Sequence, residues 1–550
     1  MMRRAIALVV AAAAFAVGSA TAATGTSSVC TGTCFAAPAG SGPLLLFTGH
    51  GWGHGVGMSQ YGAYGYAQHG WEADRILAHY YPGTTMGKAP VSQIRVLLAD
   101  KTKTLTLSST VPFSVRDGLG KTHTLAAGAV TFGATTMLAV DGQATPQALT
   151  PPLTFRAGAG GPLTLKSPYR GTIQVDVVDG KLRAVNIVGL EQYLYGVVPA
   201  EMPSNWSSEA LKAQAVAARS YALATRQIGA PYDVFSDTRS QMYLGLAHED
   251  TATRSAVDAT KGQVLTYGGK VATTYFSSTS GGVTESAWDW VGTPVPYLVS
   301  VPDPFDTISP YHNWGPVPVT GKTVVSALKI KGPITDVQMT RNATGRVSTI
   351  DLLAQTAELP VTGAKLRGAL GLRSTWFDVG ILSLTPPAPS TPVVYGSTVS
   401  LNGLVRGMSG VSLEEKPSAT TWQAVSAVVP AADGSVRLTA KPTITTDYRL
   451  ATSTAAAGSV RVKVSPLVRV TAVTADQVQG TELPLLPGAP VQVQQQNADL
   501  TWTVAAEGTV NTDGTFAVPV VLPTSTMYRV VVTPGHGYSP ATTTPQTVVR

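Results

Sequence analysis

The chain has 550 residues, of which 44% are hydrophobic and 13% charged, and its formal net charge is +7. This length suits about three domains with real hydrophobic cores. The charged share lies well below the usual quarter. Basic residues are scattered and form no binding motif, so the composition argues against a nucleic-acid partner.

Residues 1–22 have the features of a secretory signal peptide. Arg3 and Arg4 precede an apolar run over residues 6–17, and Ala20-Thr21-Ala22 supplies a small-residue cleavage site. The apolar run is too short to span a membrane comfortably. We therefore expect a secreted or cell-wall protein that has no membrane anchor after signal cleavage.

The only two cysteines, Cys30 and Cys34, lie in a linker over residues 23–42 that is rich in Gly, Ser, Thr and Ala. In an exported protein this spacing predicts a small-loop disulfide. Two cysteines alone make a poor metal site.

A glycine-rich block over residues 49–86 contains four of the eight histidines, and glycine occupies every second position from 49 to 57. The histidines require a metal site to be considered. Glycine at alternate positions leaves one face of a strand without side chains, which lets its backbone approach a ligand or another strand closely. We favour close packing or groove lining over metal binding.

Residues 94–190 are rich in β-forming patterns. Hydrophobic residues alternate with polar ones in IRVLLADKTKTLTLSS and IQVDVVDGKLRAVNIV, and Gly and Asp turns interrupt them. This predicts a β scaffold that leads into a key Ala-rich helix over residues 207–225, with Ser207 as its N-cap. One α+β domain over residues 43–380 results.

Glu201 lies directly ahead of that helix. We predict that it occupies a loop between Pro199 and Pro203, because the β-branched stretch before it ends at Pro199. Nearby Met202 and Trp206 would partly desolvate the carboxyl group, which favours general acid chemistry near neutral pH. The alternative is a structural Glu that caps the helix or pairs with a surface base.

The composition changes after residue 380. A proline-rich linker over residues 381–392 is followed by short Thr- and Val-rich strands and an internal repeat at an offset of 80, in which Trp422 matches Trp502. We predict two all-β immunoglobulin-like sandwich modules, residues 393–466 and 467–550, with these tryptophans in their cores. Such modules bind wall glycan, recruit a partner or act as spacers.

The segment YLYGVVPAEMPSNWSSEALKAQAVAARSYA closely resembles the signature of the SpoIID/LytB family, the sporulation stage II protein D and amidase-enhancer proteins of bacteria. Further motifs follow in family order, namely SQMYLG, TKGQVLTYGGK, YFSSTSGGVTES, PYLVSVPDPFD, TGRVSTIDL and LRGALGLRSTWF. The GHGVGMSQYGA motif comes first here, whereas it usually follows these segments. This order resembles a circular permutation, and the resemblance covers residues 43–380.

The resemblance implies peptidoglycan glycan strands as substrate and a lytic transglycosylase that cleaves the MurNAc–GlcNAc bond with Glu201 as acid/base. Ordinary glycosidases need a second carboxylate, for which Asp237, Glu285 and Asp289 are candidates. Some relatives use zinc near the STSGG segment, but Ser277 stands here, so we expect no metal and no cofactor. The expected substrate-binding residues are His54, Gly55, Met58, Ser59, Gln60, Tyr61, Gln214, Arg219, Tyr221, Ser278 and Ser280.

Two other function classes stay open. LytB-type relatives imply a non-catalytic peptidoglycan-binding enhancer of an N-acetylmuramoyl-L-alanine amidase, with that wall amidase as partner. The weakest option is a surface adhesin, which predicts binding by residues 392–550 alone.

Overall fold

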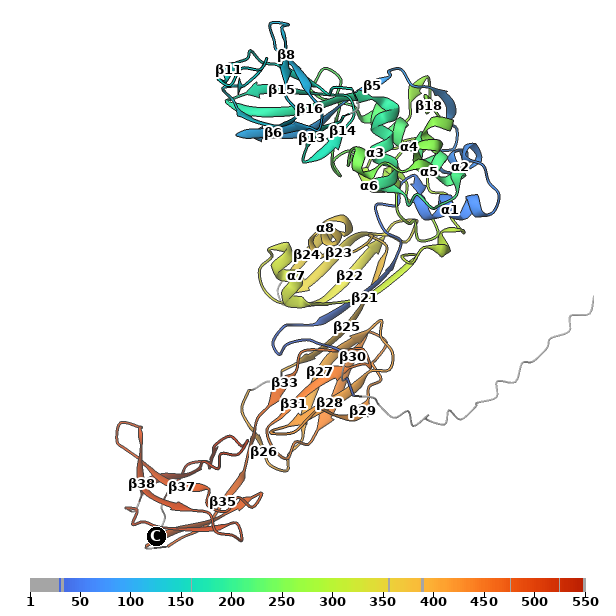
Figure 1. Cartoon of the computed structure of the whole chain (residues 1–550). Coiled ribbons are helices and arrows are strands. Elements are labelled where there is room, and N and C mark those ends of the chain that lie inside the picture. Colours follow the sequence, from blue (N-terminus) through green and yellow to red (C-terminus); the bar gives the residue numbers. More distant parts are fainter. Residues whose placement is uncertain are drawn as a thin grey trace, which may run out of the picture. The chain divides into compact units, whose positions relative to one another are not determined.

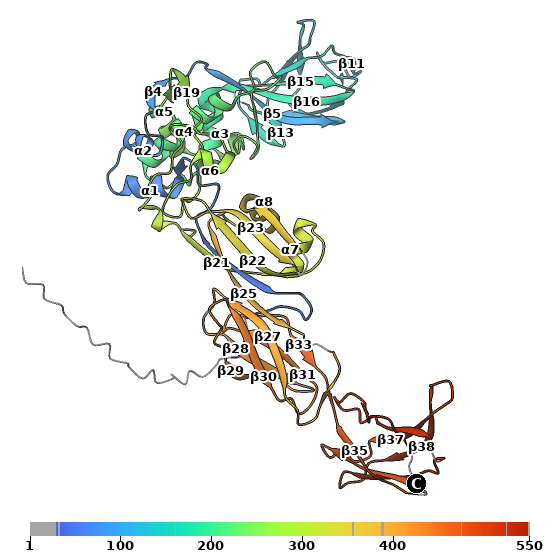
Figure 2. The ribbon, with the colours of Figure 1, turned by 180° about the vertical axis from the view of Figure 1, so that it is seen from behind.

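The computed structural model describes residues 29–30, 34–159, 161–354, 357–386, 390–474, 476–523 and 525–547. The predicted signal peptide, residues 1–22, lies outside this description. The chain forms two compact units, Leu45–Gly380 and the combination of Met1–Leu44 with Ile381–Arg550 (Figures 1 and 2). No helix in the described segments is long and apolar enough to cross a membrane.

The unit Leu45–Gly380 contains the predicted β scaffold. Its seven-stranded sheet has the order β17 (Val234–Phe235), β5 (Gln93–Thr102), β16 (Lys181–Gly189), β15 (Thr172–Val178), β12 (Leu153–Arg156), β7 (Phe113–Arg116) and β8 (Thr122–Leu125). A second sheet has the order β14 (Ser167–Tyr169), β13 (Leu163–Leu165), β6 (Thr104–Ser109) and β9 (Gly128–Gly133). Alternate residues such as Leu105 and Leu107 are buried in one shared core. The alternating pattern therefore predicted this region correctly.

Glu201 is the last residue of helix α3 (Leu190–Glu201), not part of a loop. The stretch that we interpreted as strand is a strand only through Gly189, where β16 ends. Leu190, Tyr193, Leu194 and Val197 then repeat at helical spacing and are buried. Pro199 lies in the last turn of α3, where it removes one backbone N–H donor, and the helix ends two residues later.

Helix α4 (Ser208–Thr225) forms where the alanine-rich pattern predicts it. Ser207 occupies the N-cap position, although its side chain accepts no capping hydrogen bond. Residues on nearly every side of α4 are buried, since other helices pack around it. These neighbours are α1 (Gln60–Gln68), α2 (Ala73–Tyr80), α3 and α5 (Thr251–Ala259).

Short elements complete this unit. β18 (Gln263–Tyr267) pairs with β19 (Lys270–Val271) and β4 (Thr85–Lys88), and β10 (Met137–Leu138) pairs with β11 (Gln147–Ala148). The short helices are η1 (Leu246–His248), α6 (Ala287–Val291) and η2 (Asp306–Ile308). Helices α7 (Gly321–Leu328) and α8 (Gly363–Leu370) pack on a sheet of β22 (Ile334–Arg341), β23 (Val347–Ala354) and β24 (Glu358–Thr362). β2 (Leu44–His50) lies between β21 (Asn313–Thr320) and β25 (Phe377–Thr385).

Two of the predicted linkers contain regular structure. Residues 381–385 form the end of β25 and pair with β27 (Val399–Arg406), because the alternating ILSLT sequence suits a strand. Residues 387–389 of that predicted linker lie outside the described residues. In the N-terminal linker, β1 (Phe35–Ala36) pairs in parallel with β32 (Ala455–Ala456).

The remaining strands form two β modules. The first holds β26 (Val393–Val394), β27, β28 (Ser412–Pro417), β29 (Gln423–Ala427), β30 (Ser435–Ala440), β31 (Thr446–Ala451), β32, β33 (Val460–Val462) and β34 (Val464–Ser465). The second holds β35 (Leu467–Val473), β36 (Gln477–Leu483), β37 (Pro490–Gln496), β38 (Trp502–Thr509), β39 (Thr515–Pro519), β40 (Met527–Val532), β41 (Ala541–Thr542) and β42 (Gln546–Thr547).

The internal repeat reappears as a repeated contact. The Arg449 guanidinium lies 4.0 Å above the Trp422 ring, and Arg529 lies 4.3 Å above Trp502. Both tryptophans are half-exposed, so our expectation that they fill the cores is wrong. Residues such as Leu450, Val493 and Phe516 are buried instead. Each ring therefore packs against an arginine and not in the centre of its module.

Candidate active site

The carboxyl group of Glu201 is held at the end of α3 by a backbone contact from a distant segment. The Met242 N–H donates to Glu201 Oε1 at 3.1 Å. Burial raises the pKa of Glu201 above its ordinary value, while the Met242 hydrogen bond acts in the opposite direction. The residue is only half-buried, so a ligand can reach it. A partly desolvated, accessible carboxyl group is suited to hold and deliver a proton.

Half-exposed aromatic side chains lie on segments that contact Glu201 or follow it closely in the chain. Trp206 stacks on Tyr64 with ring centroids 4.6 Å apart and meets Tyr61 edge-on at 4.7 Å. Tyr221 lies 5.6 Å from Tyr275. Burial raises the pKa of Tyr221, and the negative charges of Tyr275 and Glu201 act in the same direction. Half-exposed aromatic rings offer flat apolar surfaces to sugar rings.

Gln60 connects the glycine-rich block to Glu201. Its Nε2 donates to the backbone carbonyl oxygen of Glu201 at 2.9 Å and to Gln214 Oε1 at 3.4 Å. Gln214 is fully buried, and in the described part of the chain its Nε2 has no hydrogen-bond partner. The structure therefore brings together two predicted site residues and the proposed acid, although their side chains are mostly enclosed.

The early position of the glycine-rich block does not separate it from the later motifs. Its strand β3 (Met58–Ser59) pairs in parallel with β20 (Phe276–Ser277), and Trp52 bridges to Thr279. A Cβ at Gly53 would lie 2.5 Å from Ser277 Cβ. Gly53 has a φ of 119°, which side-chain-bearing residues rarely adopt. The glycines thus permit close packing of the two segments.

The predicted ligand contacts that stay half-exposed are Tyr61, Tyr221, Ser278 and His54. The backbone N–H of Tyr61 donates to Ser278 O at 3.0 Å, which fixes these two residues side by side. Sequence reasoning did not single out Tyr64, Met242 and Tyr275. Tyr64 and Tyr275 could have been found because they are aromatic residues next to the recognised motifs. No sequence pattern indicates that the backbone N–H of Met242 would bind Glu201.

Arg219 is not available to a ligand. Its side chain is fully buried, pairs with Glu191 at 2.5 Å, and donates to Val257 O and Gln263 O. We assigned it to the site because it follows α4 among other polar residues, but packing on all sides of α4 encloses it. Arg219 instead stabilises the start of α3.

Met58, Ser59 and Ser280 are also enclosed. Met58 lies in the helical core, and the Ser59 hydroxyl accepts from the N–H groups of Gly62 and Ser280. The Ser280 hydroxyl lies 2.7 Å from Asp303 Oδ2. Burial and the neighbouring Asp306 raise the pKa of Asp303 to about 7. These groups shape the SGG turn and do not line a groove.

His54 and Gly55 also serve the local structure. His54 Nδ1 accepts from Val56 N–H at 3.0 Å, and the ring stacks on Trp290 at 4.6 Å. Burial, with the positive charge of Arg367, lowers the pKa of His54 to about 4, so the ring is neutral at physiological pH. A Cβ at Gly55 would lie 2.6 Å from the Arg346 guanidinium.

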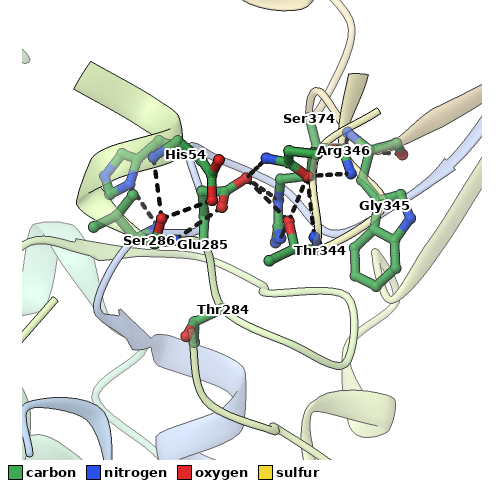
Figure 3. A network of polar contacts seen from close by, with 12 residues as sticks. His54, Thr284, Glu285, Ser286, Thr344, Gly345, Arg346 and Ser374 are labelled. Carbon is green, nitrogen blue, oxygen red and sulfur yellow. Dashed lines mark hydrogen bonds and ion pairs between the residues drawn. The ribbon is translucent and has the colours of Figure 1, made fainter. Parts of the chain in front are cut away.

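The three candidate second carboxylates are bonded elsewhere. Figure 3 shows Glu285 in a polar network with Thr344 and Arg346; Glu285 Oε2 accepts from Asn342 Nδ2 at 2.7 Å. Asp237 pairs with Arg239, and Asp289 accepts from Ser286. Across the described ranges, no group of three or more His, Cys, Asp or Glu residues is arranged to hold a metal ion.

Comparison with known proteins agrees with these motifs. A profile of the SpoIID family, described as stage II sporulation protein, matches residues 178–267. Stage II sporulation protein D of Bacillus amyloliquefaciens is 32% identical over 248 residues, which cover 41% of this chain and 69% of that protein. This chain belongs to the SpoIID family.

Two other matches are shorter. An uncharacterized protein of Brachyspira hyodysenteriae is 41% identical over 136 residues, 24% of this chain and 37% of that protein. The amidase enhancer of Bacillus subtilis is 41% identical over 121 residues, 22% of this chain and 16% of that protein. The chain thus spans well under half the length of these two relatives.

Matches to solved structures have low TM-scores. A segment of two fibronectin type III domains from chicken tenascin is 12% identical and covers 30% of this chain and 97% of that chain, with a TM-score of 0.20. Similarity at this level assigns neither a fold family nor a role to the two modules.

Proposed function

We propose that this SpoIID-family protein is a secreted lytic transglycosylase that cleaves the MurNAc–GlcNAc bond of peptidoglycan glycan strands. The observation that supports this most is Glu201 itself, a half-buried residue whose carboxyl pKa is raised and whose charge acts on the half-exposed Tyr221. The relatives named for sporulation and amidase enhancement support a cell-wall role.

The reaction needs only one carboxyl group. Glu201 Oε1 accepts from Met242, which leaves Oε2 to carry the proton. Protonated Glu201 donates to the glycosidic oxygen as the C1–O bond of the muramoyl residue breaks. The resulting carboxylate then accepts the proton of the muramoyl 6-hydroxyl while O6 bonds to C1. The products are a 1,6-anhydromuramoyl end and a free 4-hydroxyl on the leaving sugar.

The test is mass spectrometry of glycan strands after incubation with the full chain that follows the predicted signal. The parent protein should release anhydromuramoyl ends, and Glu201→Gln should release none. The matched control is Glu72→Gln, which changes an exposed glutamate on another element. Hydrolytic reducing ends in place of anhydro ends, or equal activity of the Glu201 variant, would contradict the proposal.

The second candidate is a non-catalytic enhancer of a cell-wall amidase. The similarity to a protein named amidase enhancer favours it. In that case both the parent and Glu201→Gln should bind peptidoglycan without cleaving it, and both should stimulate stem-peptide release by an added N-acetylmuramoyl-L-alanine amidase to the same extent.

A further inference from the structure

A second aromatic surface lies next to the Glu201 site and carries an arginine. Trp52 is 40% exposed and meets Tyr311 edge-on at 4.4 Å. The Arg373 guanidinium lies 4.3 Å from the Tyr311 ring centroid and 4.9 Å from that of Trp52. We call Trp52, Tyr311 and Arg373 the arginine platform.

The arginine platform adjoins the groups around Glu201. Tyr61, which contacts Trp206, has its pKa raised by burial and by Tyr311, so these two phenols lie close together. Trp52 is also paired through its backbone with Thr279, directly after Ser278, which accepts from Tyr61. Backbone contacts therefore connect the segment of Tyr61 to Trp52, whose ring lies beside Arg373.

The guanidinium of Arg373 is free to bind an anion. Within the described part of the chain, no carboxylate, carbonyl or hydroxyl oxygen accepts a hydrogen bond from its side chain, and the residue is half-exposed. The two rings hold the guanidinium plane in place without using its N–H groups, which remain available in their fork geometry. That geometry matches a carboxylate.

A second arginine lies close to the arginine platform. Arg367 lies under the same loop, where its Nε donates to the backbone oxygens of Leu372 and Arg373, and burial lowers its pKa. Arg367 also contributes to the depressed pKa of His54. No acidic side chain among the described residues forms an ion pair with Arg367 or Arg373. A sugar that carries a carboxylate would compensate this charge.

We propose that the arginine platform is a subsite for a carboxylate-bearing sugar residue, with Trp52 and Tyr311 against the ring and Arg373 on the carboxylate. This inference rests on the proposed function for the identity of the polymer. Peptidoglycan offers the carboxylate in two ways, as the free lactyl group of muramic acid or as the carboxylates of a stem peptide. The chemistry at Arg373 is the same for both.

The test measures binding, which keeps it independent of cleavage. The full chain carrying Glu201→Gln is titrated with a GlcNAc–MurNAc tetrasaccharide with free lactyl groups, the same tetrasaccharide bearing L-Ala-D-Glu, and chitotetraose, which has no carboxylate. Adding Arg373→Gln should weaken binding of one or both carboxylate-bearing probes by about tenfold. It should leave chitotetraose binding unchanged. The probe that loses affinity identifies the source of the carboxylate.

Two further variants keep the test decisive. Arg75 also lies on a tryptophan, 3.7 Å above Trp71, so Arg75→Gln is a matched control that should change no affinity. Trp52→Leu should weaken all three probes. The proposal is overturned if Arg373→Gln binds every probe with an affinity within twofold of the parent. It is also overturned if chitotetraose loses as much affinity as the carboxylate-bearing probes. If the parent protein releases no anhydro products in the cleavage assay while the binding results are as expected, only the proposed function is overturned.

Discussion

Gln60 donates its Nε2 hydrogen to the backbone carbonyl oxygen of Glu201 at 2.9 Å, although 141 residues separate the two positions. The contact joins helix α1, which follows the glycine-rich block, to the last residue of α3. Because a helix end has carbonyl groups without helical partners, this side chain satisfies one of them and fixes where the Glu201 carboxyl group lies.

Gln60 is therefore a positioning residue. We expect Gln60→Ala to lower kcat for anhydromuramoyl release by about tenfold, because small displacements of a catalytic group are costly, and to leave glycan binding within twofold. Gln68→Ala changes an exposed glutamine at the other end of α1 and should have no effect. A loss of binding that equals the loss of kcat would show that Gln60 contacts substrate instead.

The rate of glycan cleavage should decline on the alkaline side of its pH profile, because Glu201 acts as the acid. The protonated form is the acid, and its pKa is raised by burial, so the rate should fall as pH rises through a value above the ordinary carboxyl range. Rates of glycan cleavage across pH measure this.

The stability of the fold should also fall as pH rises, because the pKa of Glu201 is higher in the folded than in the unfolded chain. The contribution of protonated Glu201 to stability is fully present below the pKa of the unfolded chain and declines at higher pH. Thermal melts should then show Glu201→Gln gaining stability over the parent as pH rises.

Glu482 predicts a separate pH effect in the second β module. Both of its carboxyl oxygens are buried without a hydrogen-bond partner among the described residues, and burial raises its pKa to about 7. The stabilising contribution of the protonated form is fully present below the ordinary value of 4.5 and is lost as pH rises to about 7. Glu482→Gln should remove this dependence, as seen by hydrogen exchange of β36 at pH 5 and pH 8. Glu507→Gln, an exposed change in the same module, should leave the dependence intact.

Arg449 should contribute more to stability than a comparable surface arginine. It pairs with buried Glu414 at 2.7 Å and donates to Cys30 O at 3.2 Å, while Glu414 accepts from Cys30 N–H. Arg449→Met leaves a buried carboxylate unpaired, which costs about 3–5 kcal/mol. Arg461→Met breaks an exposed pair with Asp447 on the same sheet and should cost no more than about 1 kcal/mol. Chemical denaturation of the full chain compares the two; equal effects would contradict this account.

The sequence allowed the β scaffold, helix α4 and the repeat of the modules to be predicted, because each follows from a periodic pattern. It did not allow α3 to be predicted, since the burial of Leu190 and Tyr193 at helical spacing outweighed the β-branched composition and the presence of Pro199. Arg219 and Ser280 were assigned to the site from their polarity, but polar residues are also used inside cores when partners satisfy them. Such partners, Glu191 and Asp303 here, come from distant segments that no local pattern connects.

The pairing of β3 with β20 also determines when the site can form during synthesis. Residues 49–61 are made early, yet their partners lie more than 200 residues later. A chain released before residue 280 would contain Glu201 and its helix without the SGG turn that holds the glycine-rich strand. Contacts this distant in sequence form slowly. The contacts between these two motifs can thus form only after residue 280 has been made, whereas they do not require residues 381–550.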